Sequence, residues 1–160
     1  MKLFDRKFFY FLFVLAAAVV LTACGGSSTF SKVNTASDGI ALKGFDAVAY
    51  FAVNAAAKGD QKYEFVWNGA KWLFSNAENL ERFRQNPEAY APQFGGYCSY
   101  AVSKGYTADG DPEAWKIVDG KLYLNYNKDV RAVWEANEAA NIEKGINNWA
   151  GFETNAPEHK

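Results

Sequence analysis

Two tight-turn signals constrain the fold more than any other feature of the chain. Asn68-Gly69 and Asp119-Gly120 each stand between runs of apolar and aromatic residues. Such pairs favour two-residue turns between antiparallel strands, because both turn residues readily adopt positive φ. The flanking runs are rich in aromatic and β-branched residues and predict four strands: 63–67, 71–74, 115–118 and 122–126. We therefore expect two β-hairpins.

Helical signals follow each hairpin. Ser75 and Glu78 have the spacing of a capping box, which predicts a helix that runs to about residue 85. We expect a short helix over 97–103 and a long C-terminal helix over 127–148, the latter with an apolar stripe. The predicted class is α+β, a small antiparallel sheet built from two hairpins and packed by helices, including a long C-terminal helix. We expect no internal repeat.

The N-terminus has the pattern of an export signal. Three basic residues precede an uncharged, mostly apolar run from Phe8 to Ala23, which is shorter than the roughly 20 residues of a membrane span. The run ends in Leu-Thr-Ala-Cys-Gly, which resembles the lipobox of bacterial lipoproteins. That resemblance implies cleavage before Cys24, a lipid thioether on its sulfur and an acyl chain such as palmitate on its amine. A plain signal peptide with a chance cysteine and an uncleaved anchor are the alternatives.

These observations divide the chain into four segments. We expect a signal peptide over 1–23, a flexible tether over 24–38, one folded domain over 39–151 and a loose polar tail over 152–160. Gly25 follows the lipidated cysteine where an aspartate would favour the inner membrane, so the resemblance implies a periplasm-facing outer-membrane anchor. Without its signal the chain carries a net charge of −3. This argues against nucleic acid as a partner, because phosphate binding needs a basic surface.

The order of several motifs resembles the YHS domain family, in its exported bacterial branch. The matching segments are spread over the predicted domain: 44–51, 72–75, 86–93, 95–98 and 115–126. Many related domains belong to metal-handling proteins, including copper-transporting ATPases, and carry a Phe-Cys-Ser motif with a second cysteine four residues after the first. The matching positions here are Ser75 and Asn79, so the resemblance implies the family fold without that metal site.

Cys98 is the one cysteine of the predicted domain, and three interpretations of it stay open. It is a candidate ligand for a transition metal such as copper or zinc, although one thiolate does not complete a site. The interpretation that we favour is a small apolar residue in the core beside a possible site, since free cysteines are often buried. A nucleophilic role would need a nearby base, and the chain's one histidine, His159, lies in the predicted tail. We therefore expect no enzyme activity.

The aromatic content suggests a second kind of site. Without the signal the chain retains 21 aromatic residues, and those with polar groups need partners when buried. A small-ligand pocket could use Tyr50, Tyr97, Tyr100 and Tyr126, with Asp46 as a polar group. The alternative is that the tyrosines belong to the core and its rim, and that Asp46 accepts backbone hydrogen bonds at a turn.

The sequence thus predicts a lipid-anchored envelope module with a binding or accessory role, for a small ligand or a metal. A structural or partner-docking lipoprotein without a ligand is the alternative. A thiol or redox enzyme that uses Cys98 is the third hypothesis.

Overall fold

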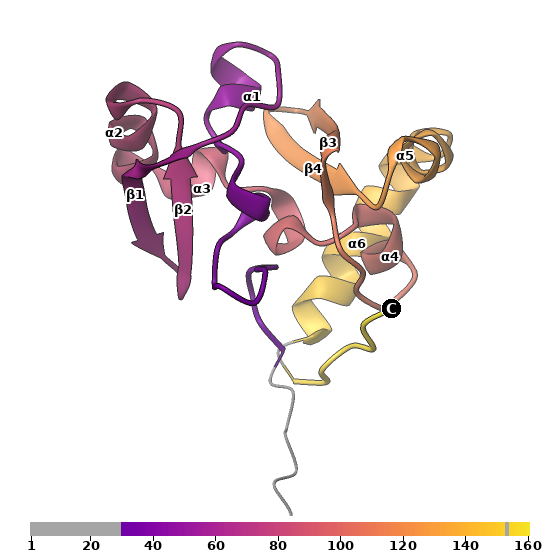
Figure 1. Cartoon of the computed structure of the whole chain (residues 1–160). Coiled ribbons are helices and arrows are strands. Elements are labelled where there is room, and N and C mark those ends of the chain that lie inside the picture. The colour runs from indigo at the N-terminus through magenta and orange to yellow at the C-terminus, as the bar shows by residue number, and fades with distance from the viewer. Residues whose placement is uncertain (1–29, 153) are drawn as a thin grey trace, which may run out of the picture.

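The computed structural model describes residues 30–152 and 154–160. It confirms the α+β class, with helices packed against two β-hairpins (Figure 1). In chain order the elements are η1 Leu42–Gly44, α1 Ala49–Ala52, β1 Asp60–Trp67, β2 Ala70–Phe74, α2 Ala77–Gln85, α3 Pro87–Tyr90, η2 Gln93–Gly96, α4 Ser99–Ser103, β3 Asp111–Val118, β4 Lys121–Asn125, α5 Lys128–Glu135 and α6 Glu138–Phe152.

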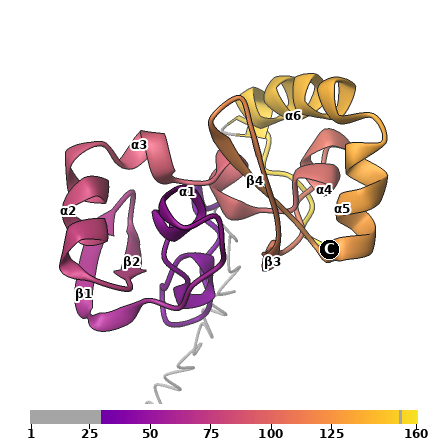
Figure 2. The same ribbon diagram turned by 90° about the horizontal axis from the view of Figure 1, so that it is seen from above.

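Both predicted hairpins are present, with their turns at the predicted residues. Trp67 pairs with Ala70 across the first turn, and Val118 pairs with Lys121 across the second. The hairpins do not join into one sheet: β1–β2 and β3–β4 are separate two-stranded sheets. Figure 2 shows them in two units that lie side by side.

The two units are copies of one structural pattern, so the prediction of no internal repeat is wrong. Repeat 1 (residues 42–85) and repeat 2 (residues 94–136) share the order helical turn, short helix, hairpin and longer helix. Each hairpin has an eight-residue strand, a two-residue turn and a five-residue strand. Each also has an irregularity at the same place, between Asp60 and Glu64 in repeat 1 and between Asp111 and Trp115 in repeat 2.

Backbone conformations match between the repeats position by position. Each repeat opens with three consecutive residues of positive φ, at 42–44 and at 94–96. The next residue of each makes an antiparallel bridge to the loop before the hairpin: Phe45 to Lys58 in repeat 1, and Tyr97 to Asp109 in repeat 2. Since these conformations are uncommon outside glycine, their recurrence in the same order is strong evidence for a structural repeat.

Each repeat centres its packing on an aromatic residue at the same position of its longer helix. Phe83 of α2 and Trp134 of α5 are both fully buried. Phe83 packs against Trp72 of its own hairpin, with ring centroids 5.0 Å apart. Trp134 packs in the same way against Tyr123, at 5.4 Å. Burying such rings is a major source of stability in a domain of this size.

The helix boundaries differ from the prediction in two places. Asn76, rather than Ser75, is the N-cap of α2, and its side chain accepts a hydrogen bond from the backbone N–H of Asn79 at 2.9 Å. The predicted long C-terminal helix is two helices, α5 and α6, with a break at residues 136–137. At the break, Asn141 donates from its amide to the carbonyl oxygen of Trp134 at 2.9 Å, which ties the two helices together.

The segments predicted as tether and tail contact the domain wherever the structure describes them. Phe30 packs against Trp149 of α6, and Val33 is buried in the core. In the tail, Thr107 donates its backbone N–H to Glu158 at 2.7 Å and accepts from Lys160 at 2.8 Å. The predicted signal peptide and Cys24 lie outside the described residues. Within 30–152 and 154–160, no helix combines the length and apolar character needed to cross a bilayer.

Candidate functional site

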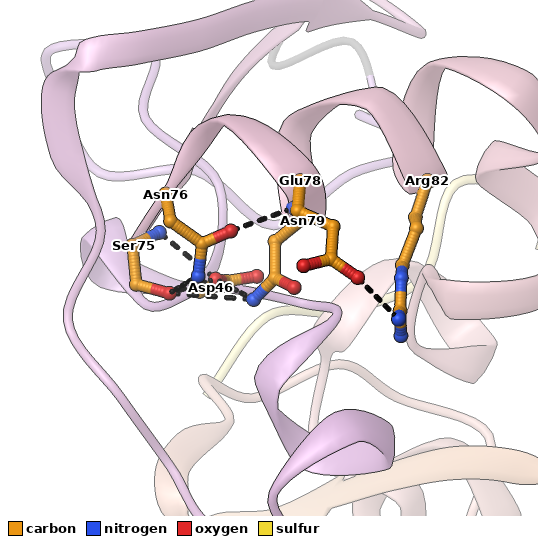
Figure 3. Close-up of polar contacts among 6 residues, drawn as sticks. All are labelled: Asp46, Ser75, Asn76, Glu78, Asn79 and Arg82. Carbon is orange, nitrogen blue, oxygen red and sulfur yellow. Dashed lines mark hydrogen bonds and ion pairs between the residues drawn. The ribbon is translucent and has the colours of Figure 1, made fainter.

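Asp46 is fully buried where α1, β2 and α2 meet (Figure 3). One carboxylate oxygen accepts from the backbone N–H groups of Val48 and Ala49, at 2.8 and 3.3 Å. The other accepts from the backbone and hydroxyl of Ser75, at 2.9 and 2.7 Å, and from the Asn79 amide at 2.7 Å. Five donors thus offset the cost of burying this carboxylate. Asp46 thus accepts backbone hydrogen bonds at a turn, as one of the two predicted alternatives stated. It also joins that turn to the residues that begin α2.

The side chains of Ser75 and Asn79 both donate hydrogen bonds to Asp46. The Asn79 amide lies 3.3 Å from the Ser75 hydroxyl, so the two side chains and the carboxylate form one closed set of hydrogen bonds. Glu78 does not reach back to cap the helix and instead pairs with Arg82 on the surface. The two residues that the predicted YHS resemblance aligns with a metal site are thus part of a hydrogen-bonded cluster.

Tyr50, in α1, is fully buried. Its hydroxyl donates to the carbonyl oxygen of Pro112 at 2.9 Å, and its ring packs edge-on against Trp115. Burial raises the pKa of the Tyr50 phenol, and the carboxylates of Asp111, Asp46 and Glu113 raise it further. Tyr50 therefore fastens repeat 1 to the second hairpin as a neutral phenol.

Cys98 is buried at the start of α4 and is a packed thiol in this structure. Its Sγ lies 3.9 Å from the side-chain oxygen of Asn125, at the end of β4. Burial raises the pKa of the Cys98 thiol, against hydrogen bonds from the backbone at Ala101, Tyr126 and Tyr100 that act to lower it. At neutral pH the sulfur is thus a protonated thiol, which is a poor nucleophile.

The remaining tyrosines do not meet around one cavity. Tyr97 is buried, donates to the carbonyl oxygen of Ser31 at 3.2 Å and stacks with Phe30. Tyr100 is half-buried beneath the Lys104 ammonium, and Tyr126 is exposed. The structure therefore places the predicted ligand residues in two separate repeats, Asp46 and Tyr50 in the first and Tyr97, Cys98 and Tyr100 in the second.

The described residues contain no group of three or more His, Cys, Asp or Glu side chains suited to a metal ion. His159, expected in a loose tail, is held beside repeat 2. Its Nδ1 lies 3.0 Å from the Thr107 hydroxyl, and its Nε2 lies 3.6 Å from an Asp109 oxygen. Its ring also meets the ring of Tyr97 edge-on, with centroids 6.0 Å apart. These contacts fix the tail against the loop before β3.

A cleft of about 320 Å³ lies between repeat 1 and helix α6. Aromatic rings and a proline supply its apolar walls: Trp67, Trp72, Pro92, Phe94 and Trp149. Lys32 and Glu88 bring one charge of each sign to the same cleft. Its volume lies at the lower end of the range of small-ligand sites.

The cleft depends on a close backbone approach at Gly95. This residue has a φ of +60°, and a Cβ there would lie 2.0 Å from the Lys32 carbonyl oxygen. The Gly95 carbonyl in turn accepts from the backbone N–H of Asn34 at 2.9 Å. Gly95 thus combines a positive φ with a backbone approach too close for any Cβ, which only glycine allows.

Sequence reasoning missed this cleft because it considered only tyrosines and Asp46 as residues of a pocket. Trp72 and Trp134 are buried, but Trp67 and Trp149 are only half-buried. Trp149 follows two asparagines near the end of α6, and Trp67 directly precedes the Asn68-Gly69 turn. A large aromatic residue next to polar or turn residues in the sequence is the signal that could have identified these two tryptophans as partly exposed.

No known protein supports an assignment of this chain by similarity. Comparison with protein-family models, with curated proteins and with solved structures found no match. The resemblance to the YHS domain family therefore stays a prediction.

Proposed function

We propose that this chain is a lipid-anchored accessory module of the bacterial cell envelope that binds a small ligand in the cleft between repeat 1 and α6. The anchor at Cys24 and the outer-membrane location follow from the N-terminal sequence alone. The observation that carries the binding role is the cleft itself, which combines half-buried tryptophans with a charge of each sign.

The walls of the cleft favour a ligand with a planar apolar part. Trp67 and Trp149 come from different parts of the chain, and each is supported by other rings. Trp67 packs against Trp72 and Phe83, both at 5.8 Å between centroids, and Trp149 packs against Phe94 at 5.9 Å. Because these neighbours hold the two indoles, a ligand between them would bind without ordering flexible side chains.

The direct test is native mass spectrometry of the full chain, extracted from membranes without chelator. We expect a bound small molecule that is lost in Trp67→Ala and in Trp149→Ala. Tyr126→Ala removes an exposed aromatic ring outside the cleft and is the matched control. A molecule retained in both tryptophan variants would place binding elsewhere. Elemental analysis of the same sample tests the metal hypothesis, copper or zinc, in which Cys98 is the candidate ligand.

The alternative is a docking lipoprotein without a ligand. Large apolar residues exposed on two adjoining helices favour it, with Val133 of α5 54% exposed and Ile146 of α6 50% exposed. A chain that is bare in native spectra, and whose Trp67 and Trp149 variants behave as the unchanged protein, would support this alternative over ligand binding.

A further inference from the structure

The tail of this chain binds repeat 2 in the manner of an added strand. Thr107 donates its backbone N–H to the carbonyl oxygen of Glu158 at 2.7 Å and accepts from the N–H of Lys160 at 2.8 Å. These two bonds make a parallel bridge between Thr107 and His159. Repeat 2 therefore holds an extended three-residue segment by main-chain hydrogen bonds, as proteins that recognise peptides at a strand edge do.

Repeat 1 has a residue at the place of Thr107, which is Ala56. Ala56 precedes the bridged Lys58 by two positions, and Thr107 precedes the bridged Asp109 by two. The backbone two positions before each of them, at residues 54 and 105, has positive φ in both repeats. The loops that precede the two hairpins therefore match residue by residue around Ala56 and Thr107.

The residues next to Ala56 and Thr107 correspond as well. Ala57 accepts from the backbone N–H of Asp46, and Ala108 accepts from that of Cys98, both at 2.8 Å. Asp46 and Cys98 each follow the three residues of positive φ by one position. Asp46 and Cys98 thus hold the same position in the two repeats, and the loop residues bonded to them do too.

The backbone of Ala56 is open where that of Thr107 is covered. No described residue makes a hydrogen bond to the backbone N–H or the carbonyl oxygen of Ala56. Thr107 is 3% exposed beneath the tail, whereas Ala56 is half-buried. Val53, three positions before Ala56, is a large apolar side chain that is 66% exposed. A backbone donor and acceptor beside an exposed apolar residue are thus available to an extended segment.

The charge beside this open backbone is opposite to that in repeat 2. In repeat 2, Nε2 of His159 lies 3.6 Å from a carboxylate oxygen of Asp109. The residue that matches Asp109 is Lys58. Its ammonium lies 3.9 Å from the centre of the Phe45 ring and donates to the carbonyl oxygen of Lys43 at 3.1 Å, and it forms no ion pair with a described residue. A segment docked on repeat 1 would therefore meet a cation where the tail meets an anion.

A hollow of about 380 Å³ lies at Lys58 and leaves room for an acidic side chain. Lys43 lines the same hollow, and Asp38 is the one acidic residue among those that line it. The Asp38 carboxylate accepts from the backbone N–H of Ile40 at 3.0 Å, so it is tied to its own loop. Two lysines against one aspartate give the hollow an excess of positive charge, which attracts an acidic group and repels a basic one.

We propose that repeat 1 is a docking site for an extended segment of a partner protein, which bonds to the backbone of Ala56 and carries an acidic residue opposite Lys58. The first residue of the segment accepts from the Ala56 N–H through its carbonyl oxygen. The third donates its own N–H to the Ala56 carbonyl oxygen and so is not proline. The middle residue takes the place that His159 has in repeat 2. The tail of a second copy is disfavoured, since His159 and Lys160 would approach Lys58.

The test adds two synthetic peptides to the isotopically labelled full chain in detergent micelles and follows its amide signals by NMR. One peptide has the sequence of residues 155–160, and the other is the same peptide with His159→Asp. We expect the aspartate peptide to shift the amide signals of Ala56 and Lys58 until they saturate. It should bind there on the order of tenfold more tightly than the tail peptide, because an attraction replaces a repulsion.

The position of the shifts separates this site from the others. Signals at Thr107 report any exchange with the chain's own tail, and the indole signals of Trp67 and Trp149 report binding in the cleft. Shifts confined to either of those places, or no saturable shift at Ala56, would overturn the docking site. A tail peptide that binds at Ala56 as tightly as the aspartate peptide would overturn the acidic partner and favour a second copy of this chain.

A charge reversal tests Lys58 without changing the backbone at Ala56. Lys58 is exposed, and we expect Lys58→Glu to reverse the preference, so that the tail peptide binds more tightly than the aspartate peptide. Lys62→Glu is the matched control, because it makes the same change of charge at an exposed lysine of β1 that does not line the hollow. Equal peptide preferences in the two variants would contradict the role of Lys58.

The backbone bonds are tested from the side of the peptide, which leaves the fold of the chain untouched. Methylation of the backbone nitrogen of the third docked residue, at the position of Lys160, removes the donor to the Ala56 carbonyl oxygen. We expect it to weaken binding on the order of tenfold. Methylation one position earlier, at the position of His159, is the control, because the N–H of His159 takes no part in the bridge to Thr107. Equal binding by the two methylated peptides would overturn the proposed geometry.

Discussion

Repeat 1 and repeat 2 have the same backbone pattern but different chemistry at its centre. In repeat 1 the central side chain is the Asp46 carboxylate, which is satisfied by five donors. In repeat 2 it is the buried Cys98 thiol, whose Sγ lies 3.9 Å from the Asn125 side-chain oxygen. The comparison shows that the shared backbone fixes where the central side chain lies, and that the residue type decides whether this place holds a hydrogen-bonded carboxylate or a neutral thiol.

The repeats also differ in the helix that follows them. After α2, repeat 1 continues only into the four residues of α3, whereas α5 leads into the 15-residue α6. Helix α6 brings Trp149 to the cleft and packs against Phe30, so the described N-terminal segment is held on this side. The asymmetry that creates the cleft therefore comes from the extension of one repeat, since the repeats themselves are alike.

The largest effect should come from removing the carboxylate at the centre of repeat 1. Asp46→Ala leaves buried donors from Ser75 and Asn79 without an acceptor, and we expect it to lower the free energy of unfolding by about 3 kcal/mol. Cys98→Ala at the matching position removes one weak thiol donor to Asn125 and should cost about 1 kcal/mol. Urea unfolding followed by tryptophan fluorescence measures both. Equal losses would mean that the central side chain matters to both repeats in the same way.

The sequence allowed the fold class and both hairpins to be predicted, because turn chemistry is local. Asn68-Gly69 and Asp119-Gly120 adopt the positive φ values that such pairs favour, so their positions were correct. The internal repeat could not be predicted, because matching positions often differ in residue type. Phe83 matches Trp134, and Leu42, a residue that seldom has positive φ, matches Phe94. The repeats share their backbone conformations and their pattern of burial. Neither produces a recurring pattern of residue types in the sequence.

The sites were predicted less well than the fold, for a physical reason. Asp46 and Cys98 were singled out as separate candidates, and their equivalence depends on backbone groups whose positions only the folded chain defines. The cleft depends on Trp149, more than fifty residues from the other rings that line it. Local patterns predict which residues lie in a turn or helix, but not which side chains from distant segments meet.

A second prediction uses a residue that distinguishes repeat 1 from repeat 2. Tyr50 matches Val102, and its hydroxyl bonds to Pro112. Tyr50→Phe should lower the free energy of unfolding at pH 7 by about 2 kcal/mol, since it leaves a buried carbonyl without its donor. Thermal or urea unfolding at neutral pH measures this loss. Val102→Ala is the comparison in repeat 2, because it removes only apolar atoms and no hydrogen bond.

The destabilising effect of the same variant should become smaller at alkaline pH. Burial raises the pKa of Tyr50 above the value of about 10 in an unfolded chain. As pH rises above about 10, the unfolded state loses a proton that the folded state keeps, so stability falls until the folded phenol ionises as well. Tyr50→Phe removes this contribution, and its stability should fall less steeply above pH 10. The measurement is the free energy of unfolding as a function of pH, and the exposed Tyr126→Phe is the surface control. Stability curves of the variant and the unchanged chain that fall in parallel above pH 10 would contradict this prediction.

A third and smaller effect tests whether the hairpin turns are equivalent. Gly69 and Gly120 have φ values of +74° and +72°, and a Cβ added at either would meet nothing within 4 Å. Alanine at either position therefore costs only the strain of a left-handed conformation, and we expect about 1.5 kcal/mol for each. Chemical unfolding of the two single variants provides the comparison. A loss at one turn that is twice the loss at the other would show that the hairpins do not contribute equally.

The smallest effect separates the two helix caps. Asn76 accepts from the backbone N–H of Asn79 at 2.9 Å, and Asn127 accepts from that of Val130 at 2.8 Å, so alanine at either should cost about 1 kcal/mol. Asn76 also donates to the Ser75 hydroxyl at 3.2 Å, which links its cap to the Asp46 cluster. Serine at either position retains an oxygen for the cap, so Asn127→Ser should recover most of the loss, whereas Asn76→Ser should recover less. Equal recovery would mean that the cap of repeat 1 acts independently of the carboxylate beside it.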